Sequence, residues 1–242
     1  MSREGKRRLL IALCIACTIL FTSLAVWQVE RRAWKLDLIA RVDARVHAAP
    51  APLPARGSWS TLNPRAIEYR HVAVAGEWLE GRDTFVDALT ERGAGFWVIS
   101  PLRTRDGVLL VNRGFVPAEL RETVRMRPGR RASVTGLMRL TEPGGRFLRP
   151  NEPAEERWYS RDVAAIATAR GLSNVAPFFV DADESAGSGR YPIGGLTVVS
   201  FRNAHLAYAL TWGGLALLSI AGLGLLLSPR GRSQAEASER AR

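Results

Sequence analysis

Two uninterrupted apolar segments, residues 9–29 and 207–227, dominate the hydrophobic pattern of this 242-residue chain. A helix rises about 1.5 Å per residue, so roughly 20 apolar residues cross the hydrocarbon core of a bilayer. Each segment therefore predicts a transmembrane helix. The first is longer than the apolar part of a typical signal peptide and has no clear small-residue cleavage site, which indicates an uncleaved anchor.

Between these segments the pattern changes to short runs bounded by glycine and proline, which is typical of strands. Val72, Val74 and Trp78 alternate with small or polar residues, as a strand with one buried face requires. The runs 96–99 and 108–111 are continuously apolar and predict central strands. The expected strands cover residues 71–79, 84–88, 96–102, 108–115, 133–139, 177–181 and 196–201.

Two further helical patterns accompany the strands. Apolar residues on one stripe continue the first apolar helix beyond the membrane, and we expect it to end near the proline-rich segment 49–54. A short helix is predicted after Ser160, which can cap its start, with Asp162 in the first turn and Gly171 at its end. Where the central strand 108–115 approaches Pro117, we expect Gly114 to need a conformation unsuited to bulky residues and Arg113 to be mainly structural.

Together these elements predict a membrane α+β protein, with two transmembrane helices flanking an extracytoplasmic, mainly antiparallel β domain. The pattern leaves open whether the sheet closes into a barrel. The expected order is a cytoplasmic N-terminus (1–8), the first transmembrane helix (9–29), a periplasmic α+β domain that includes the helical extension (30–206), the second transmembrane helix (207–227) and a disordered cytoplasmic tail (228–242).

Charge and cysteine content refine this arrangement. Short basic ends favour the cytoplasm for both termini, although Arg31, Arg32 and Lys35 argue for the opposite orientation. The net charge of +11 is dispersed among acids instead of forming a stripe, which argues against a nucleic-acid partner. Both cysteines, Cys14 and Cys17, lie in the first apolar segment, so the outer domain cannot be built on disulfides.

Candidate chemistry gathers where the two apolar segments reach the outer membrane surface. Antiparallel helices would bring two faces together there, one carrying Arg202, His205, Tyr208 and Trp212, the other carrying Trp27, Arg31, Trp34 and Lys35. Aromatic and basic residues at this level commonly serve as interfacial anchors. His205 is also an ionisable group near the start of a span, and a neutral imidazole is a good iron ligand. An exposed interfacial histidine is the alternative.

Motifs for catalysis are scarce, so we expect a protein that is not an enzyme. The chain has three histidines and contains neither a G-x-S-x-G elbow nor an H-E-x-x-H sequence. Cys14 and Cys17 form a C-x-x-C that could carry redox chemistry, but thiols in apolar surroundings resist ionisation and usually serve packing.

A series of short motifs runs from the first apolar segment to the second. It begins with Trp27-Gln28-x-x-Arg31-x-x-Trp34-Lys35 and continues through Glu68-Tyr69-Arg70-His71-Val72, Gly95-Phe96-Trp97-Val98, Val111-Asn112-Arg113-Gly114-Phe115, Arg149-Pro150-Asn151, Pro177-Phe178-Phe179-Val180-Asp181 and Asn203-x-His205-Leu206-x-Tyr208-Ala209-x-Thr211-Trp212. This ordered set resembles the Surfeit locus protein 1 family, whose members are assembly factors for haem–copper cytochrome c oxidase. Two positions depart from the family: Ala25 stands where glycine is usual, and Gly213 where an aromatic residue is common. With Ala209 and Ala216, Gly213 offers a small-residue helix contact.

The resemblance implies a non-enzymatic role in maturing the large oxidase subunit, with haem a as cofactor and His205 as axial ligand of the haem iron. Its partners would be the cytochrome c oxidase large subunit, the haem-synthesis machinery and the lipid bilayer, in a bacterial inner (plasma) membrane. Arg202 could pair with a haem propionate. The remaining residues assigned to cofactor binding are Tyr208, Trp212, Trp27, Gln28 and Arg31.

Two other functions remain open at this point. One is a structural membrane adaptor that stabilises an oxidase assembly intermediate without binding cofactor. The other is a membrane-anchored oxidoreductase that uses Cys14 and Cys17.

Overall fold

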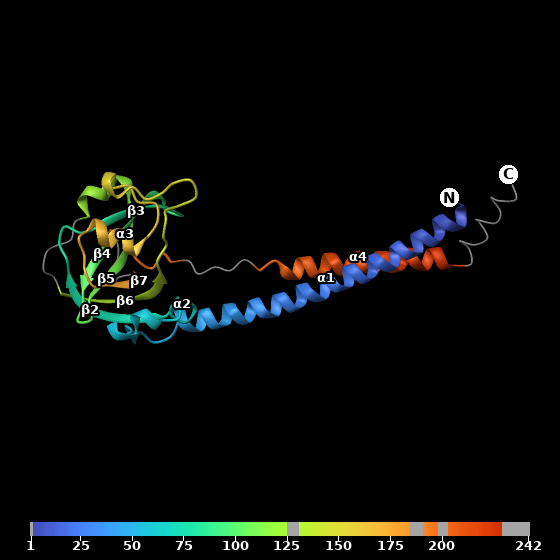
Figure 1. Cartoon of the computed structure of the whole chain (residues 1–242), viewed down its shortest axis with the longest axis horizontal. Coiled ribbons are helices and arrows are strands. Elements are labelled where there is room, and N and C mark those ends of the chain that lie inside the picture. The colour runs from blue at the N-terminus through green and yellow to red at the C-terminus, as the bar shows by residue number, and fades with distance from the viewer. Residues whose placement is uncertain (1, 125–130, 184–190, 198–202, 229–242) are drawn as a thin grey trace. The chain divides into compact units, whose positions relative to one another are not determined.

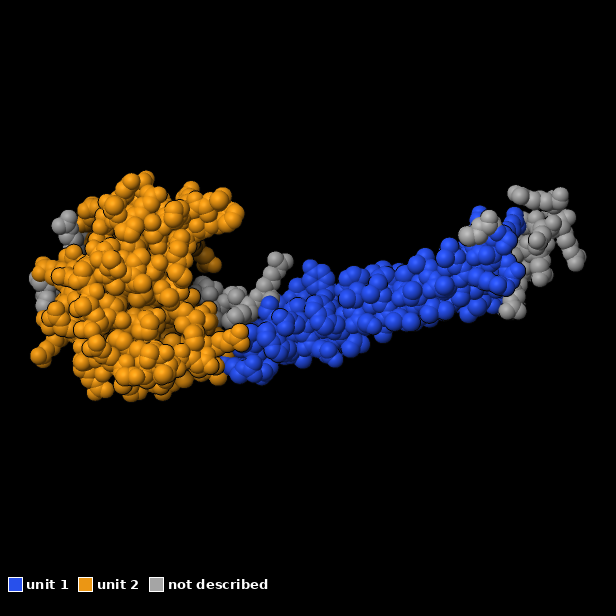
Figure 2. Space-filling model, in the orientation of Figure 1, with its two compact units in different colours: residues 1–41, 200–242 blue, residues 42–199 orange. Residues whose placement is uncertain are grey.

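The structure, a computed structural model, describes residues 2–124, 131–183, 191–197 and 203–228 (Figure 1). The chain forms two compact units, one of residues 1–41 with 200–242 and one of residues 42–199 (Figure 2). The first unit is helical and the second contains the β-sheet. Both are described separately below.

The helical unit contains two helices long and apolar enough to cross a membrane, α1 (Arg3–Val46) and α4 (His205–Leu227). They are antiparallel, because Arg7 donates to the carbonyl of Leu226 at one end and Gln28 contacts His205 at the other. Helix α1 continues well past its apolar segment and ends at Val46, just before the prolines that were expected to stop it.

The contact face of α1 repeats every seven residues. Arg7, Cys14, Phe21 and Gln28 all face α4, and this spacing is the one that keeps a seam between two supercoiled helices. On α4, the predicted small-residue contact is confirmed for Ala209 and Ala216, which are buried. It is wrong for Gly213, because a Cβ added there would meet no atom within 4 Å.

The second unit is a barrel-like sheet of seven strands (Figure 1). The order across the sheet is β1-β2-β6-β7-β5-β4-β3, and β2 also pairs with β4 through Glu77↔Arg103 and Trp78↔Leu102. The ring β2-β6-β7-β5-β4 is thereby closed. The strand bounds are β1 (Ala51–Pro52), β2 (His71–Trp78), β3 (Thr84–Thr90), β4 (Gly93–Arg103), β5 (Val108–Pro117), β6 (Arg131–Leu140) and β7 (Val175–Ala182).

Most strand pairs are antiparallel, as expected; only β1–β2 and β5–β7 are parallel. Six of the seven expected strands are confirmed. The seventh, 196–201, is wrong where it can be examined, since Leu196 and Thr197 are not in a strand; its other residues lie outside the described part of the chain. Short helices connect the strands: η1 (Arg56–Thr61), α2 (Pro64–Ile67), η2 (Ala118–Thr123), η3 (Pro153–Glu155) and α3 (Val163–Ala169).

Two apolar clusters lie on opposite faces of the barrel wall. The interior is filled by alternating side chains of the ring strands, such as Val72, Val111, Met138 and Phe178, as period-two strands require. Outside, α3 packs its buried residues against Trp158 and the neighbouring strands. This explains why residues 108–111 of β5 and 178–180 of β7 are apolar without interruption, because both faces of these segments are covered.

The start of α3 differs from the sequence-based interpretation in one respect. Asp162, not Ser160, is the N-cap, and its carboxylate accepts a hydrogen bond from the amide of Ala165. Ser160 instead donates to the carbonyl of Glu142 and accepts from Asn151 and Gly145. Ser160 therefore connects two loops by hydrogen bonds. Asp162, two residues later, caps the helix by accepting a hydrogen bond from a backbone amide of its first turn.

Gly114 has the conformation predicted for it. Its φ is +122°, and an added Cβ would lie 2.0 Å from the carbonyl oxygen of Ile193, which pairs with Phe115. A larger residue would be strained and would also displace the Ile193 segment.

A buried ionic network joins three strands of the barrel. The carboxylate of Asp181 on β7 accepts hydrogen bonds from Arg139 at 2.9 Å, Arg161 at 3.1 Å and Asn112 at 2.8 Å. Thr197 adds a fourth donor at 2.9 Å. Glu142 also pairs with Arg161; burial alone would raise the pKa of Glu142, but Arg161 and Arg139 together lower it. No local pattern in the sequence predicts this network, because its members are far apart along the chain.

We expect Asp181→Ala to lower the free energy of unfolding by about 3–5 kcal/mol, because two buried guanidinium groups would lose their shared carboxylate. Urea denaturation of the detergent-solubilised chain measures this. Asp106→Ala is the control, since its partner Arg105 is exposed and such pairs contribute less than about 1 kcal/mol. Equal effects of the two substitutions would contradict a structural role for the network.

Candidate functional site

The candidate site lies in the helical unit, where α4 begins. His205 is the first residue of α4, and its Nδ1 lies 2.7 Å from Oε1 of Gln28 on α1. Gln28 is buried, with 8% of its surface exposed. A buried amide next to apolar helices needs a hydrogen-bond partner, and the imidazole supplies it.

This contact indicates one tautomer of the neutral imidazole. With Oε1 of Gln28 placed toward the ring, the amide oxygen can only accept, so Nδ1 of His205 donates to it. Nε2 is then the nitrogen that carries the lone pair. Metal-binding histidines commonly have this arrangement, in which the second ring nitrogen donates to a fixed acceptor that orients the ring.

Other predicted site residues take separate positions around this pair. Trp212 stacks on Phe21, with ring centroids 5.7 Å apart and an interplanar angle of 22°. Arg31 lies over the ring of Trp34, 4.0 Å from its centroid. Trp27 and Tyr208 are about half exposed. Arg202 lies outside the described residues, so its role stays a prediction.

The structure therefore brings together only His205 and Gln28 among the predicted residues that it describes. Trp212 shares the helical face of His205 but contacts a different part of α1. Asn203, which the motif comparison included without a role, has a buried Oδ1 with no hydrogen-bond partner among the described residues. In the sequence, only the position of Asn203 two residues before His205 indicated that it could belong to the site.

The other two histidines are in the second unit and differ in environment. His47 is exposed, and its Nδ1 lies 3.0 Å from the carbonyl oxygen of Asp43. His71 has both ring nitrogens engaged, Nδ1 with the carbonyl of Ala48 and Nε2 with the carboxylate of Asp183, each at 2.8 Å. Both partners are acceptors, so both nitrogens must donate, and His71 is an imidazolium with no lone pair for a metal.

The pKa of His71 reflects these contacts. Burial alone would lower it, but the hydrogen bonds to Asp183 and Ala48 and the charge of Asp183 outweigh burial and raise it. His71 thus ties the segment after α1 to β2 and to the residue that follows β7.

The donor set at His205 restricts what could bind there. Across the described ranges, no group of three or more His, Cys, Asp or Glu side chains could hold a bare metal ion. A single imidazole fits a metal that brings its other donors with it, as haem iron does through the porphyrin nitrogens. The exposed rings of Trp27 and Tyr208 offer flat apolar surface on the same helices.

Comparison with known proteins shows the family. The SURF1 family model matches residues 15–217. Surfeit locus protein 1 of Rattus norvegicus is 37% identical over 212 residues, covering 79% of this chain and 67% of the rat protein. The human protein of the same name is 36% identical over 214 residues, covering 80% and 69%. A SURF1-like protein of Monosiga brevicollis is 32% identical over 223 residues, covering 82% and 80%.

A chain with two apolar helices flanking a closed β-barrel unit is the class of protein that the structure defines. The chain belongs to the SURF1 family. The resemblance identified from the motifs is thereby confirmed.

We expect the stability contributed by His71 to decrease as pH rises. A raised native pKa means that the contribution is fully present below the unfolded pKa of about 6.5 and is lost as pH rises through the native value. The difference in free energy of unfolding between wild type and His71→Ala should therefore be larger at acidic than at alkaline pH, in urea denaturation of the full chain. His47→Ala, at an exposed site, is the control. A difference that grows with pH would contradict the imidazolium assignment.

Proposed function

We propose that this chain is an assembly factor for haem–copper cytochrome c oxidase that binds haem a through His205 and aids its insertion into the large subunit. The observation that carries the proposal is the hydrogen bond from His205 to buried Gln28, which orients the imidazole and leaves Nε2 as the ligand nitrogen. Family membership supports it, because both residues belong to the motifs that carry the resemblance.

Each side chain has a defined part in this proposal. His205 supplies the axial nitrogen, and Gln28 holds the ring against rotation. The redox-active iron and the macrocycle would be supplied by haem a when bound. Arg202 pairs with a propionate, and Trp27, Arg31, Tyr208 and Trp212 line or support the apolar side of the cofactor. The role is binding and transfer, not catalysis.

The proposal includes a membrane location. Helices α1 and α4 span a bacterial inner membrane, both termini lie in the cytoplasm, and the barrel unit lies in the periplasm. Their length and apolar composition support spanning, and their antiparallel packing is consistent with two passes. The proposed partners are the lipid bilayer, the large oxidase subunit and the haem-synthesis machinery.

A structural adaptor is the second candidate, and one feature of the barrel unit favours it. Phe147 and Leu148 are 88% and 85% exposed in a tight turn whose flanking residues, Arg146 and Arg149, exchange two backbone hydrogen bonds of 2.8 Å. Two large apolar side chains held outward in this way are suited to contact with another protein.

We expect reporter fusions after Arg242 to be active only for a cytoplasmic reporter, and fusions at Gly129 only for a periplasmic one. Two membrane passes require this pattern. Fusions at both positions in one chain background measure it, with expression levels as the control. The reverse pattern would exclude the proposed topology.

The haem proposal predicts how strongly each substitution reduces haem binding. His205→Ala should abolish the Soret absorbance of the purified full chain while insertion and folding persist. Gln28→Ala should weaken haem binding roughly 10–100-fold, since residues that orient a metal ligand usually contribute this much. Arg202→Ala should weaken it less than His205→Ala, because a hydrogen bond to a charged group contributes only about 1.5–3 kcal/mol, less than the iron–nitrogen bond itself.

His47→Ala is the matched control and should retain wild-type haem content. Haem content unchanged in His205→Ala and Gln28→Ala, together with normal oxidase assembly, would overturn the haem proposal and favour the adaptor.

A further inference from the structure

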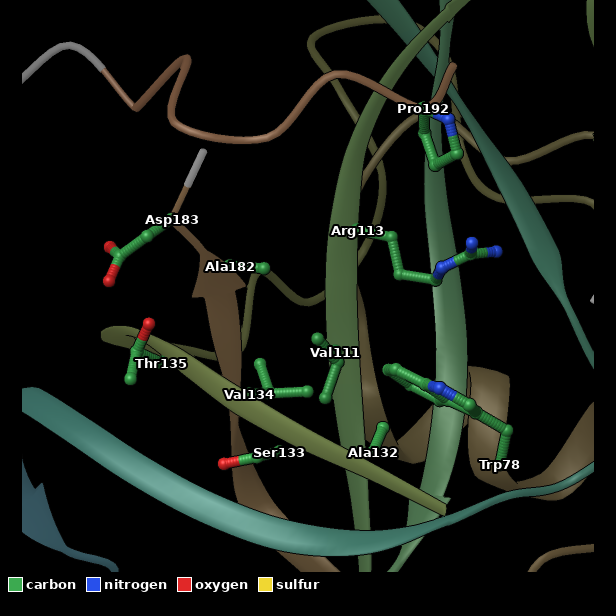
Figure 3. A pocket seen from close by; sticks show the side chains of 10 residues that line it. All are labelled: Trp78, Val111, Arg113, Ala132, Ser133, Val134, Thr135, Ala182, Asp183 and Pro192. Atoms are coloured by element: carbon green, nitrogen blue, oxygen red, sulfur yellow. The ribbon is translucent and has the colours of Figure 1, made fainter. Parts of the chain in front are cut away.

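A cavity of about 510 Å³ lies in the barrel unit, beyond the end of β7 (Figure 3). Its accessible lining is more polar than apolar, and Val111 and Val134, which also border it, are buried in the barrel interior. Arg113 and Trp78 lie on one side, with Asp183 on the other (Figure 3). The volume falls within the range of small-ligand pockets, which are usually apolar with a few fixed polar groups.

Arg113 is one of the residues with a buried polar atom that the fold leaves unsatisfied, and it lines this cavity. Its Nη1 is buried and has no hydrogen-bond partner among the residues that the structure describes. The guanidinium lies 5.7 Å from the ring of Trp78, a contact with the ring face that satisfies none of its N–H groups in the plane. A buried donor without an acceptor is costly, so native proteins rarely retain one without a purpose.

The guanidinium of Arg113 has two acidic residues in its surroundings, Asp83 and Asp183. Burial lowers the pKa of Arg113 and the charge of Asp83 opposes that shift, but a guanidinium remains protonated at neutral pH. The acid on the opposite side, Asp183, is already paired with His71 at 2.8 Å. The positive charge of Arg113 is therefore not offset by Asp183.

The expected structural role of Arg113 does not account for this arrangement. The arginines with structural contacts in the same barrel, Arg139 and Arg161, both donate to the carboxylate of Asp181. Arg113 is buried beside a cavity instead. Its neighbour Gly114 brings the Ile193 segment close, and Pro192 of that segment also lines the cavity.

We propose that this cavity is a binding site for a carboxylate attached to a small apolar group, with Arg113 as the anion ligand and Ala132, Ala182 and Pro192 as the accessible apolar part of the lining. A planar guanidinium matches a carboxylate better than a spherical anion. The carboxylate could belong to a small molecule or to the C-terminus of a polypeptide. This site is independent of His205 and of the haem proposal.

The test uses the full chain in detergent micelles with ¹⁵N-labelled arginine. The Nε–H signal of Arg113 is assigned by its absence in Arg113→Lys, and it is followed during titration with benzoate, benzamide and inorganic phosphate. Benzoate should shift it saturably and benzamide should not, because only benzoate carries the carboxylate. A peptide arm compares acetyl-Ala-Phe with its C-terminal amide.

Three substitutions test whether benzoate binds at this cavity. Arg113→Lys should weaken benzoate binding, measured by calorimetry, roughly tenfold or more, since a lysine cannot donate in the same planar fork. Ser133→Trp, at an exposed position on the rim, should block binding without affecting the fold, which keeps the test informative if Arg113→Lys is unstable. Arg92→Lys, an exposed arginine in the β3–β4 turn, is the control and should bind within about twofold of wild type.

Saturable benzoate binding without peptide binding would assign the site to a small molecule, and tighter binding of the peptide acid than of benzoate would assign it to a C-terminus. Either result supports the proposal. Equal shifts by benzoate and benzamide, phosphate binding as tight as benzoate, or unchanged affinity in both Arg113→Lys and Ser133→Trp would overturn it.

Discussion

The buried carboxylate of Asp181 is the constraint on which the barrel depends. An ionised carboxylate in an apolar interior is stable only with charged or hydrogen-bonding partners, and Asp181 takes these from β6, from β5 and from the segment before α3. The need to pair this carboxylate therefore brings side chains from Asn112 to Thr197 into contact with Asp181. Register between β5, β6 and β7 follows, because a shift by one residue would move Asp181 to the other face of the sheet.

The helical unit follows the same rule with uncharged groups. Gln28 is a buried polar residue on an otherwise apolar seam, and His205 is its partner. A single polar pair of this kind selects one register between two helices, since any other register would leave the amide without a partner. The interaction that orders the helices thus also orients the imidazole, which links the stability of the unit to its proposed ligand role.

Arg113 contrasts with both networks. Arg139 and Arg161 have carboxylates supplied by the fold, whereas the buried nitrogen of Arg113 has no acceptor among the described residues and adjoins a cavity. Arg139 also has one buried nitrogen, Nε, without a partner among the described residues, but its Nη1 donates to Asp181, whereas Arg113 adjoins the cavity, where a ligand could supply an acceptor. The proposed carboxylate site rests on this difference.

The sequence by itself determined the two apolar helices, six strands and the special conformation of Gly114, because length, period-two alternation and turn residues are local properties. It also indicated His205 and Gln28 through their motifs. The cap of α3 was assigned to Ser160 because serine and aspartate are both good caps, and only the contacts of Ser160 with Glu142 and Asn151 decided between them. Four features could be seen only in the tertiary structure. They are the closure of the sheet through β2 and β4, the Asp181 network, the pairing of Gln28 with His205 and the unsatisfied nitrogen of Arg113. Each depends on contacts between residues far apart in the chain, which no local sequence pattern encodes.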